Sequence, residues 1–168
     1  DLPDTIPGTL GGMVFSRDGA TLFYGLVNDH WRIDRIMSHR MGSPTAEDKI
    51  VYVEADQGFQ AGVGMTHDRN WIVIAAGDNE TSEVRLIPAD KADAEACLVR
   101  ARQKGVEYDV EAHGDMLFIH TNDVSPQFRL VTAPISDPGE WTERIAASPD
   151  FYMTGVTTFA DFFVVEGR

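Results

Sequence analysis

Serine is the residue type in this chain that could act as a catalytic nucleophile, provided that its surroundings activate it. In hydrolases that carry the serine on a sharp strand-to-helix turn, glycines flank it in a Gly-x-Ser-x-Gly pattern. None of the seven serines has this pattern; they are Ser16, Ser38, Ser43, Ser82, Ser125, Ser136 and Ser148. Ser38 is next to His39, but neighbours on a strand point to opposite faces, so the two cannot act as nucleophile and base. The sequence therefore predicts no catalytic serine in this chain.

Histidine, cysteine and clustered carboxylates are the other groups that could do chemistry. None of the five histidines belongs to a His-Glu-x-x-His or His-x-His pair; they are His30, His39, His67, His113 and His120. Asp78 and Glu80 offer oxygen ligands for calcium, but their loop lacks the length and the glycine of a known calcium motif. Cys97, the single cysteine, opens a short apolar run, so we expect a small packed side chain. The sequence predicts no metal site and no cofactor.

The charge balance of the chain is strongly acidic. Its 168 residues include 14 Lys and Arg against 27 Asp and Glu, for a formal net charge of −13. This balance argues against nucleic acid and against an anionic membrane surface as partners, because both need a basic footprint, while it suits cationic substrates. A single cysteine permits no intrachain disulfide, and no apolar run approaches the length of a membrane span, so we expect a cytoplasmic protein.

Short strand-like runs dominate the chain, and helical patterns are scarce. The runs are rich in β-branched and aromatic residues, and polar turns separate them. Fourteen strands are expected, over residues 13–16, 21–27, 32–37, 49–53, 62–66, 71–75, 82–87, 97–100, 108–111, 116–120, 128–132, 141–145, 152–157 and 162–165. We expect residues 89–96 to form a long loop with one turn, and Trp31, Trp71 and Trp141 to lie in the core or between sheets. The spacing predicts an antiparallel all-β fold.

A polar turn that carries Asp and leads into a continuous apolar strand recurs along the chain. Equivalent positions are Phe23, Val73, Phe118 and Val164, which lie 50, 45 and 46 residues apart. A period of about 45 residues with four strands is the size of one β-propeller blade. The apolar strand fits the second strand of a blade, which neighbouring blades cover on both faces. A two-sheet sandwich with accidental periodicity is the alternative, and the repeat favours a partial β-propeller.

The repeat divides this single propeller fragment, residues 1–168, into blades. Three four-stranded blades cover about residues 10–55, 58–102 and 104–146, and a half blade covers about residues 150–168. The last apolar strand ends close to Arg168, in mid-blade. Because a propeller stays soluble by closing its ring, we expect the chain to be a fragment of a larger protein.

Five strings carry a further signal, in order along the chain and at blade spacing. They are His39–Pro44 continuing through Glu47–Asp56, Thr81–Leu86, Phe118–Asn122 with Gln127–Leu130, Trp141–Glu143 and Phe159–Glu166. They resemble blade motifs of the prolyl oligopeptidase family of serine peptidases, and within it of oligopeptidase B, such as H-x-x-G-(S/T), T-S-E-V-R-L and W-x-E. Gln127 stands where that family usually has Asn. Each motif is weak alone, but five in order over about residues 10–168 are specific.

The resemblance implies a two-part enzyme. A seven-bladed propeller caps an α/β-hydrolase domain with a Ser-Asp-His triad, and oligopeptidase B cleaves short peptides after Arg and Lys. The propeller restricts entry, so folded proteins are excluded. This chain would then be about half of the ring, a gating and filtering segment that is inactive without the hydrolase domain it lacks. Two copies of about three and a half blades could also complete seven, so a homodimer through open blade edges is a further expectation.

Acidic loop residues are the candidate substrate-binding groups. In a four-stranded blade, the loop between strands two and three and the loop to the next blade open on one face. Those loops contain Asp29, Asp78, Glu80 and Asp123, and Asp56 lies at a blade junction. The resemblance implies that this face looks toward the catalytic domain and that the turn at residues 77–81 walls the substrate cavity. Such carboxylates would attract Arg- and Lys-containing peptides, although Asp is also a common turn residue.

Two other functions fit the repeat. One is a stand-alone propeller-repeat scaffold that makes protein contacts. The other is an independent propeller enzyme, such as a lactonase or a sugar hydrolase. That enzyme would need metal-binding carboxylates that face inward along a central channel, and the sequence shows no such regular set.

Overall fold

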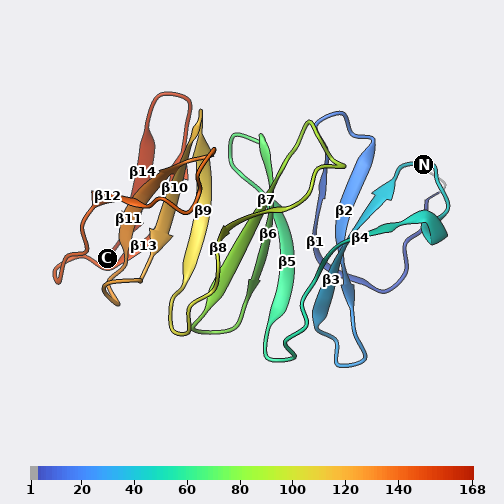
Figure 1. The fold of residues 1–168 in the computed structure, drawn as a ribbon, viewed down its shortest axis with the longest axis horizontal. Coiled ribbons are helices and arrows are strands. Elements are labelled where there is room, and N and C mark those ends of the chain that lie inside the picture. The colour runs from blue at the N-terminus through green and yellow to red at the C-terminus, as the bar shows by residue number, and fades with distance from the viewer. Residues whose placement is uncertain (1–3) are drawn as a thin grey trace. The chain divides into compact units, whose positions relative to one another are not determined.

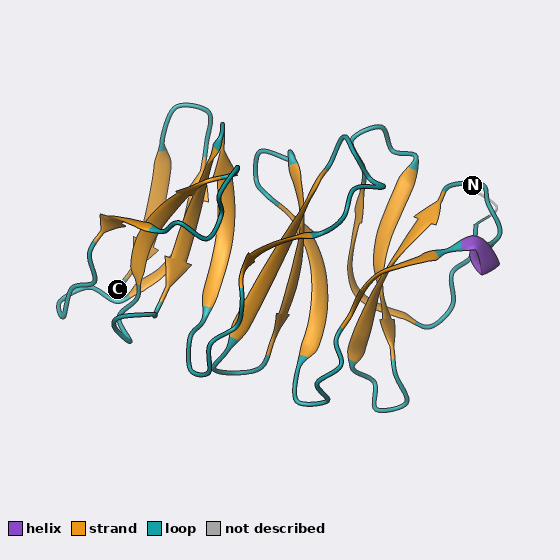
Figure 2. Ribbon diagram, viewed as in Figure 1, coloured by secondary structure: helices purple, strands orange, loops and turns teal. Residues whose placement is uncertain are grey.

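The computed structural model describes residues 4–168, and in this range the backbone consists of strands, turns and one short 3-10 helix, η1 (Thr45–Glu47) (Figure 2). The strands are β1 (Thr9–Phe15), β2 (Thr21–Val27), β3 (Ile33–Arg40), β4 (Lys49–Val53), β5 (Gln60–Met65), β6 (Trp71–Gly77), β7 (Ser82–Pro88), β8 (Cys97–Arg100), β9 (Tyr108–His113), β10 (Met116–Thr121), β11 (Arg129–Pro134), β12 (Thr142–Ile145), β13 (Met153–Thr158) and β14 (Phe163–Gly167). Every predicted strand is present, and residues 89–96 form a loop with turns. Within the described range, no helix is long and apolar enough to cross a membrane.

Each sheet is a meander whose neighbouring strands are consecutive in the chain (Figure 1). The strand orders are β1-β2-β3-β4, β5-β6-β7-β8, β9-β10-β11-β12 and β13-β14. Pairing is antiparallel, as in the unbroken β9–β10 and β10–β11 ladders. Three four-stranded sheets and one two-stranded sheet in residues 4–168 confirm the predicted all-β, partial-propeller pattern, with open sheets.

The recurring polar turn has a local physical cause. In the β1–β2 turn, the Ser16 hydroxyl donates to Asp18 Oδ1 at 2.6 Å, and the same oxygen accepts from the backbone N–H of Ala20 at 3.0 Å. Gly19 then takes φ +70°, which a glycine adopts without steric cost. The β5–β6 turn repeats the pattern, with the Thr66 hydroxyl 2.6 Å from Asp68 Oδ1. These two hairpins therefore close on a hydroxyl–carboxylate pair that fixes where the apolar strand begins.

The chain divides into two compact units. The first comprises residues up to 65, 69–78 and 85–97, and its core contains Phe23, Ile36, Ile72, Ile74 and Ile87. A Cβ at Gly12 would lie 2.8 Å from the Val63 carbonyl oxygen, so β1 approaches β5 at a distance that suits glycine alone. The second unit comprises residues 66–68, 79–84 and 98–168. One cluster in its core joins Leu130, Met153 and Val156.

Two sequence predictions about single side chains are wrong. Trp31 is 77% exposed rather than in the core, because it lies in the β2–β3 turn with φ +59°. Asn28 shapes this turn, since its side-chain oxygen accepts from the backbone N–H groups of His30 and Arg32. Cys97 is exposed rather than packed, because it begins β8, the fourth strand of its sheet. Trp71 and Trp141 are half-buried.

Candidate functional site

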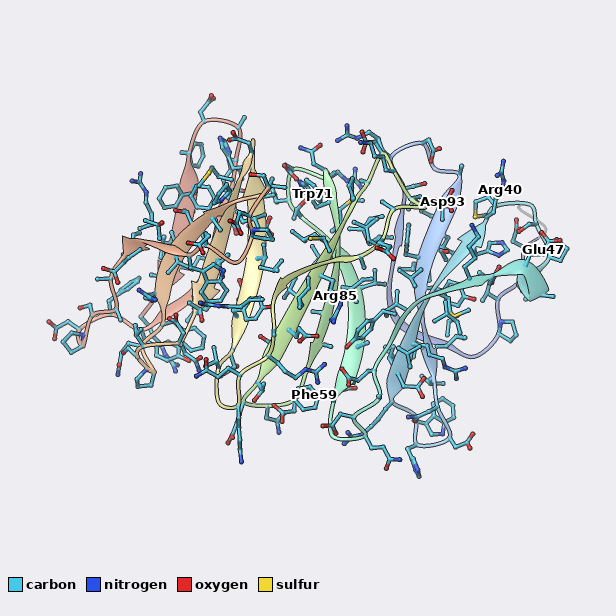
Figure 3. The ribbon with its side chains drawn as sticks, viewed as in Figure 1. Arg40, Glu47, Phe59, Trp71, Arg85 and Asp93 are labelled. Atoms are coloured by element: carbon cyan, nitrogen blue, oxygen red, sulfur yellow. The ribbon has the colours of Figure 1, made fainter. Side chains whose placement is uncertain are left out.

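An acidic cavity in the first unit brings two of the predicted substrate-binding residues together. It has a volume of about 280 Å³, and its lining includes Asp29 from the β2–β3 loop and Asp56 from the β4–β5 loop. Asp34, Glu54 and Phe59 also line it, and Phe59 is labelled in Figure 3. A concave surface lined by carboxylates favours a cationic ligand. Among residues 4–168, no group of three or more His, Cys, Asp or Glu side chains is placed to hold a metal ion.

Hydrogen bonds fix the two loops that form this cavity. The Arg32 guanidinium donates to the carbonyl oxygen of Gln57 and so ties the β2–β3 loop to the β4–β5 loop. Glu54 is buried and accepts from the Tyr52 hydroxyl at 2.7 Å and from the Asp56 backbone N–H at 2.9 Å. Asp56 itself accepts from the Gly58 N–H at 2.8 Å. Asp56 therefore shapes its own turn while its charge stays at the cavity.

The remaining predicted acids lie elsewhere. Asp78 and Glu80 are exposed in the β6–β7 loop, Asp78 in the first unit and Glu80 in the second, and neither lines the acidic cavity. Asp123, in the β10–β11 loop, accepts two hydrogen bonds of 2.8 Å from Arg129. Arg129 also reaches Glu143 at 2.9 Å, and these hydrogen bonds raise the pKa of its guanidinium. The charge of Asp123 is therefore compensated within its own unit.

The comparisons with known proteins agree with the sheet pattern. A family model described as the N-terminal β-propeller domain of prolyl oligopeptidase matches residues 1–168. The chain belongs to the prolyl oligopeptidase family. It is 33% identical to dipeptidyl aminopeptidase BI of Pseudoxanthomonas mexicana and 28% identical to protease 2 of Moraxella lacunata. Each alignment covers 99% of this chain and 24% of the relative, so the chain spans about a quarter of their length.

Solved structures place this prolyl oligopeptidase propeller near oligopeptidase B. The oligopeptidase B of Trypanosoma brucei, in a closed form with covalently bound antipain, matches with a TM-score of 0.93 and 32% identity. That match covers 98% of this chain and 24% of the other. The oligopeptidase B of Leishmania major matches with a TM-score of 0.94 and 32% identity, over 99% of this chain and 24% of the other. The chain is thus a partial β-propeller that is similar to part of the N-terminal propeller of these oligopeptidase B structures.

This propeller also holds a buried histidine cluster that the sequence reasoning missed. His39 Nδ1 lies 2.6 Å from Asp48 Oδ1, and its Nε2 lies 3.1 Å from Asp4 Oδ1. The Tyr24 hydroxyl donates to the other oxygen of Asp48 at 2.7 Å. Burial alone lowers the pKa of His39, but the hydrogen bonds to Asp48 and Asp4 raise it above its ordinary value overall. An imidazolium that bridges two carboxylates supports the fold here, with no substrate-facing surface of its own.

A second buried histidine, His120, lies in the second unit. Its Nδ1 is 2.9 Å from Asp109 Oδ2, and its Nε2 is 3.1 Å from the carbonyl oxygen of Met153. The sequence signal that could have found it is the cross-strand register, because Asp109 lies directly opposite His120 in the β9–β10 ladder. That register follows from the short His113–Asp115 turn.

Proposed function

We propose that this chain is the non-catalytic gating and substrate-filtering part of an oligopeptidase-B-like serine peptidase that cleaves short peptides after Arg or Lys. The observation that carries the proposal is the match to two oligopeptidase B structures over 98% and 99% of the chain. The absence of a Gly-x-Ser-x-Gly serine from the sequence supports a non-catalytic role. Its principal partner would be an α/β-hydrolase domain of the same protein. The cytoplasmic location stays a prediction from the sequence.

The acidic cavity supports the filtering role. Asp29 and Asp56 would raise the local concentration of Arg- and Lys-containing peptides, since a concave surface lined by one sign of charge focuses its potential. Asp78 and Glu80, which are exposed in the β6–β7 loop, stay predicted contributors to the attraction of basic peptides. Asp123 would contribute least, because Arg129 compensates its charge.

The first experiment tests the non-catalytic role. The purified chain is incubated with an arginine naphthylamide, with and without a serine-directed inhibitor. We expect no hydrolysis above background. Hydrolysis that the inhibitor abolishes would show that a nucleophilic serine lies within these residues and would overturn the proposal.

The second experiment tests the acidic cavity directly. An arginine amide is titrated at low salt while the backbone amide shifts of Asp29 and Asp56 are followed by NMR. We expect shifts that a neutral norleucine amide does not cause, and that Asp29→Asn with Asp56→Asn removes. Asp115→Asn, at an exposed Asp in the β9–β10 turn, is the matched control and should leave the shifts intact. Equal shifts with both ligands would argue against a cation-attracting role.

A stand-alone interaction scaffold is the second candidate function. Phe159 and Phe162, in the β13–β14 turn, are 37% and 59% exposed and stack with their ring centroids 4.9 Å apart. Exposed stacked aromatics are typical of protein contacts. A homodimer through open blade edges is a separate proposal for the chain, and light scattering tests it. A mass that stays monomeric at millimolar concentration would contradict the homodimer.

A further inference from the structure

Both ring nitrogens of His120 face hydrogen-bond acceptors. Nδ1 lies 2.9 Å from a carboxylate oxygen of Asp109, and Nε2 lies 3.1 Å from the backbone carbonyl oxygen of Met153. The His120 side chain is 6% exposed, so water has little room to replace either partner. A neutral imidazole carries one N–H, and an imidazolium carries two. Only the protonated ring can therefore donate to both acceptors at once.

The groups around His120 favour the charged ring. Asp109 lies directly opposite His120 on the neighbouring strand β9, and the negative charge of Glu107 acts on the ring as well. On β11, Leu130 is the residue opposite His120, whereas Arg129 is opposite Thr121 and so lies on the other face of the sheet.

Phe128 stacks on the imidazole with ring centroids 4.4 Å apart and planes at 20°, an arrangement that attracts a cation. Burial alone lowers the pKa of His120, but Asp109 and the Met153 carbonyl raise it overall.

The contact to Met153 joins two sheets of the second unit. His120 is on β10, in the four-stranded sheet, and Met153 begins β13, in the two-stranded sheet. The Met153 N–H also donates across the same boundary, to the Gln127 carbonyl at 2.9 Å. At the other end of β13, the Thr158 hydroxyl donates to the Ala112 carbonyl at 2.8 Å. The hairpin is thus held at two ends, and at the Met153 end one of the two hydrogen bonds depends on a proton.

We propose that the Asp109–His120–Met153 bridge is a proton-dependent latch that holds the start of β13 on the β9–β12 sheet. When His120 loses its proton, the ring keeps one N–H, and either Asp109 or the Met153 carbonyl faces a lone pair. The Met153 carbonyl then accepts from an uncharged donor or from none, so the start of β13 opens more often, while the Thr158 end stays attached. Because the folded-state pKa of His120 is raised, the latch is complete below the ordinary histidine value of about 6.5 and is lost as pH rises through the raised value.

Amide hydrogen exchange, corrected for the intrinsic effect of pH, tests the latch. We expect the Met153 N–H, which donates to the Gln127 carbonyl, to lose roughly tenfold in protection between pH 6 and pH 9, because the Met153 carbonyl no longer accepts from a charged donor and the strand opens more often. The amides of Thr157 and Thr158 should change much less. In parallel, nitrogen NMR of the His120 ring should show two N–H groups at pH 6. Uniform protection at both pH values, or one N–H at pH 6, would overturn the proposal.

Variants separate the latch from general packing. His120→Gln should remove the pH step in Met153 protection, because glutamine does not titrate, and His113→Gln, at a half-buried histidine, should keep the step. Thr158→Val should weaken protection at its own end of β13 and also keep the step. If His120→Gln does not fold, Asp109→Asn takes its place, because Asp109 is 64% exposed and its replacement should not prevent folding. Loss of this carboxylate should move the pH step to lower pH. A step that survives unchanged in both His120→Gln and Asp109→Asn contradicts the latch.

Discussion

The two units each bury one histidine between two acceptors, but the acceptors differ. In the first unit, His39 is fully buried between the carboxylates of Asp48 and Asp4, whose side chains are 2% and 8% exposed. In the second unit, His120 lies between a mostly exposed carboxylate and a backbone carbonyl. The charge of His39 therefore compensates buried negative charge, whereas the charge of His120 supplies a second donor. The same ring is a structural counter-ion in one unit and a titratable attachment in the other.

The two carboxylates around His39 depend on few hydrogen bonds. Asp48 accepts from both His39 and the Tyr24 hydroxyl, and Asp4 accepts from His39 and from the Gly42 N–H at 2.8 Å. The second oxygen of Asp4 is buried and has no hydrogen-bond partner. The hydrogen bond from His39 is the main cause that lowers the pKa of Asp4. Loss of the imidazolium would leave two carboxylates close together and poorly compensated.

Replacement of His39 should have the largest effect on stability. His39→Leu removes the shared donor of Asp4 and Asp48, so we expect a loss of about 3 kcal/mol in the free energy of unfolding at pH 6. Urea denaturation measures it. His30→Leu, at an exposed histidine in a turn, is the control and should cost less than about 0.5 kcal/mol. A loss below about 1 kcal/mol for His39→Leu would contradict the role of His39 as a structural counter-ion.

Replacement of Phe128, in the second unit, should have the next largest effect on stability. Its backbone is left-handed at φ +62°, which favours glycine, yet its ring stacks on His120 and contacts Tyr152 at 5.8 Å between centroids. Phe128→Gly relieves the backbone but removes both ring contacts, so we expect a net loss of about 2 kcal/mol in the free energy of unfolding. Thermal unfolding measures it. An unchanged or increased melting temperature would mean that the stack contributes nothing to the second unit.

Replacement of Asp109 should have a smaller, pH-dependent effect. Asp109→Asn removes the carboxylate that raises the pKa of His120, so the titration midpoint of His120 should fall. Because Asp109 is mostly exposed, the expected loss is about 0.5 kcal/mol at pH 6, and it should vanish above the wild-type midpoint. Unfolding curves at pH 6 and pH 9, with His120 followed by NMR, measure both. A loss of equal size at the two pH values would assign Asp109 a role independent of the proton.

The fold was predictable because its signals are local. The Asp-bearing turns at Asp18 and Asp68 fix where strands begin, and the approximately 45-residue period follows from one meander after another. Burial of individual side chains was less predictable. Val164 repeats the position of Phe23 but is 39% exposed, because its sheet has two strands in the described residues.

The sequence predicted site residues only where the order of the loops in a blade was enough to bring them together. Asp29 and Asp56 follow from the loops of one blade, and they line one cavity. The histidine clusters depend on partners that periodicity does not indicate: Asp48 and Asp4 lie 9 and 35 residues from His39, and Met153 lies 33 residues from His120. Hydrophobic pattern sets which face is buried, but it does not set which polar group is buried with it.

Replacement of Trp31 should have the smallest effect on stability. Trp31 and Phe128 are both aromatic residues with a left-handed backbone at positive φ, but Trp31 is 77% exposed. Trp31→Gly removes left-handed strain of about 1 kcal/mol and adds a similar entropic cost to folding, so the free energy of unfolding should change by less than about 0.5 kcal/mol. Thermal unfolding of Trp31→Gly beside Phe128→Gly measures the difference. If both variants lose stability equally, the loss comes from the entropic cost of the new glycine, and the ring stack on His120 contributes nothing.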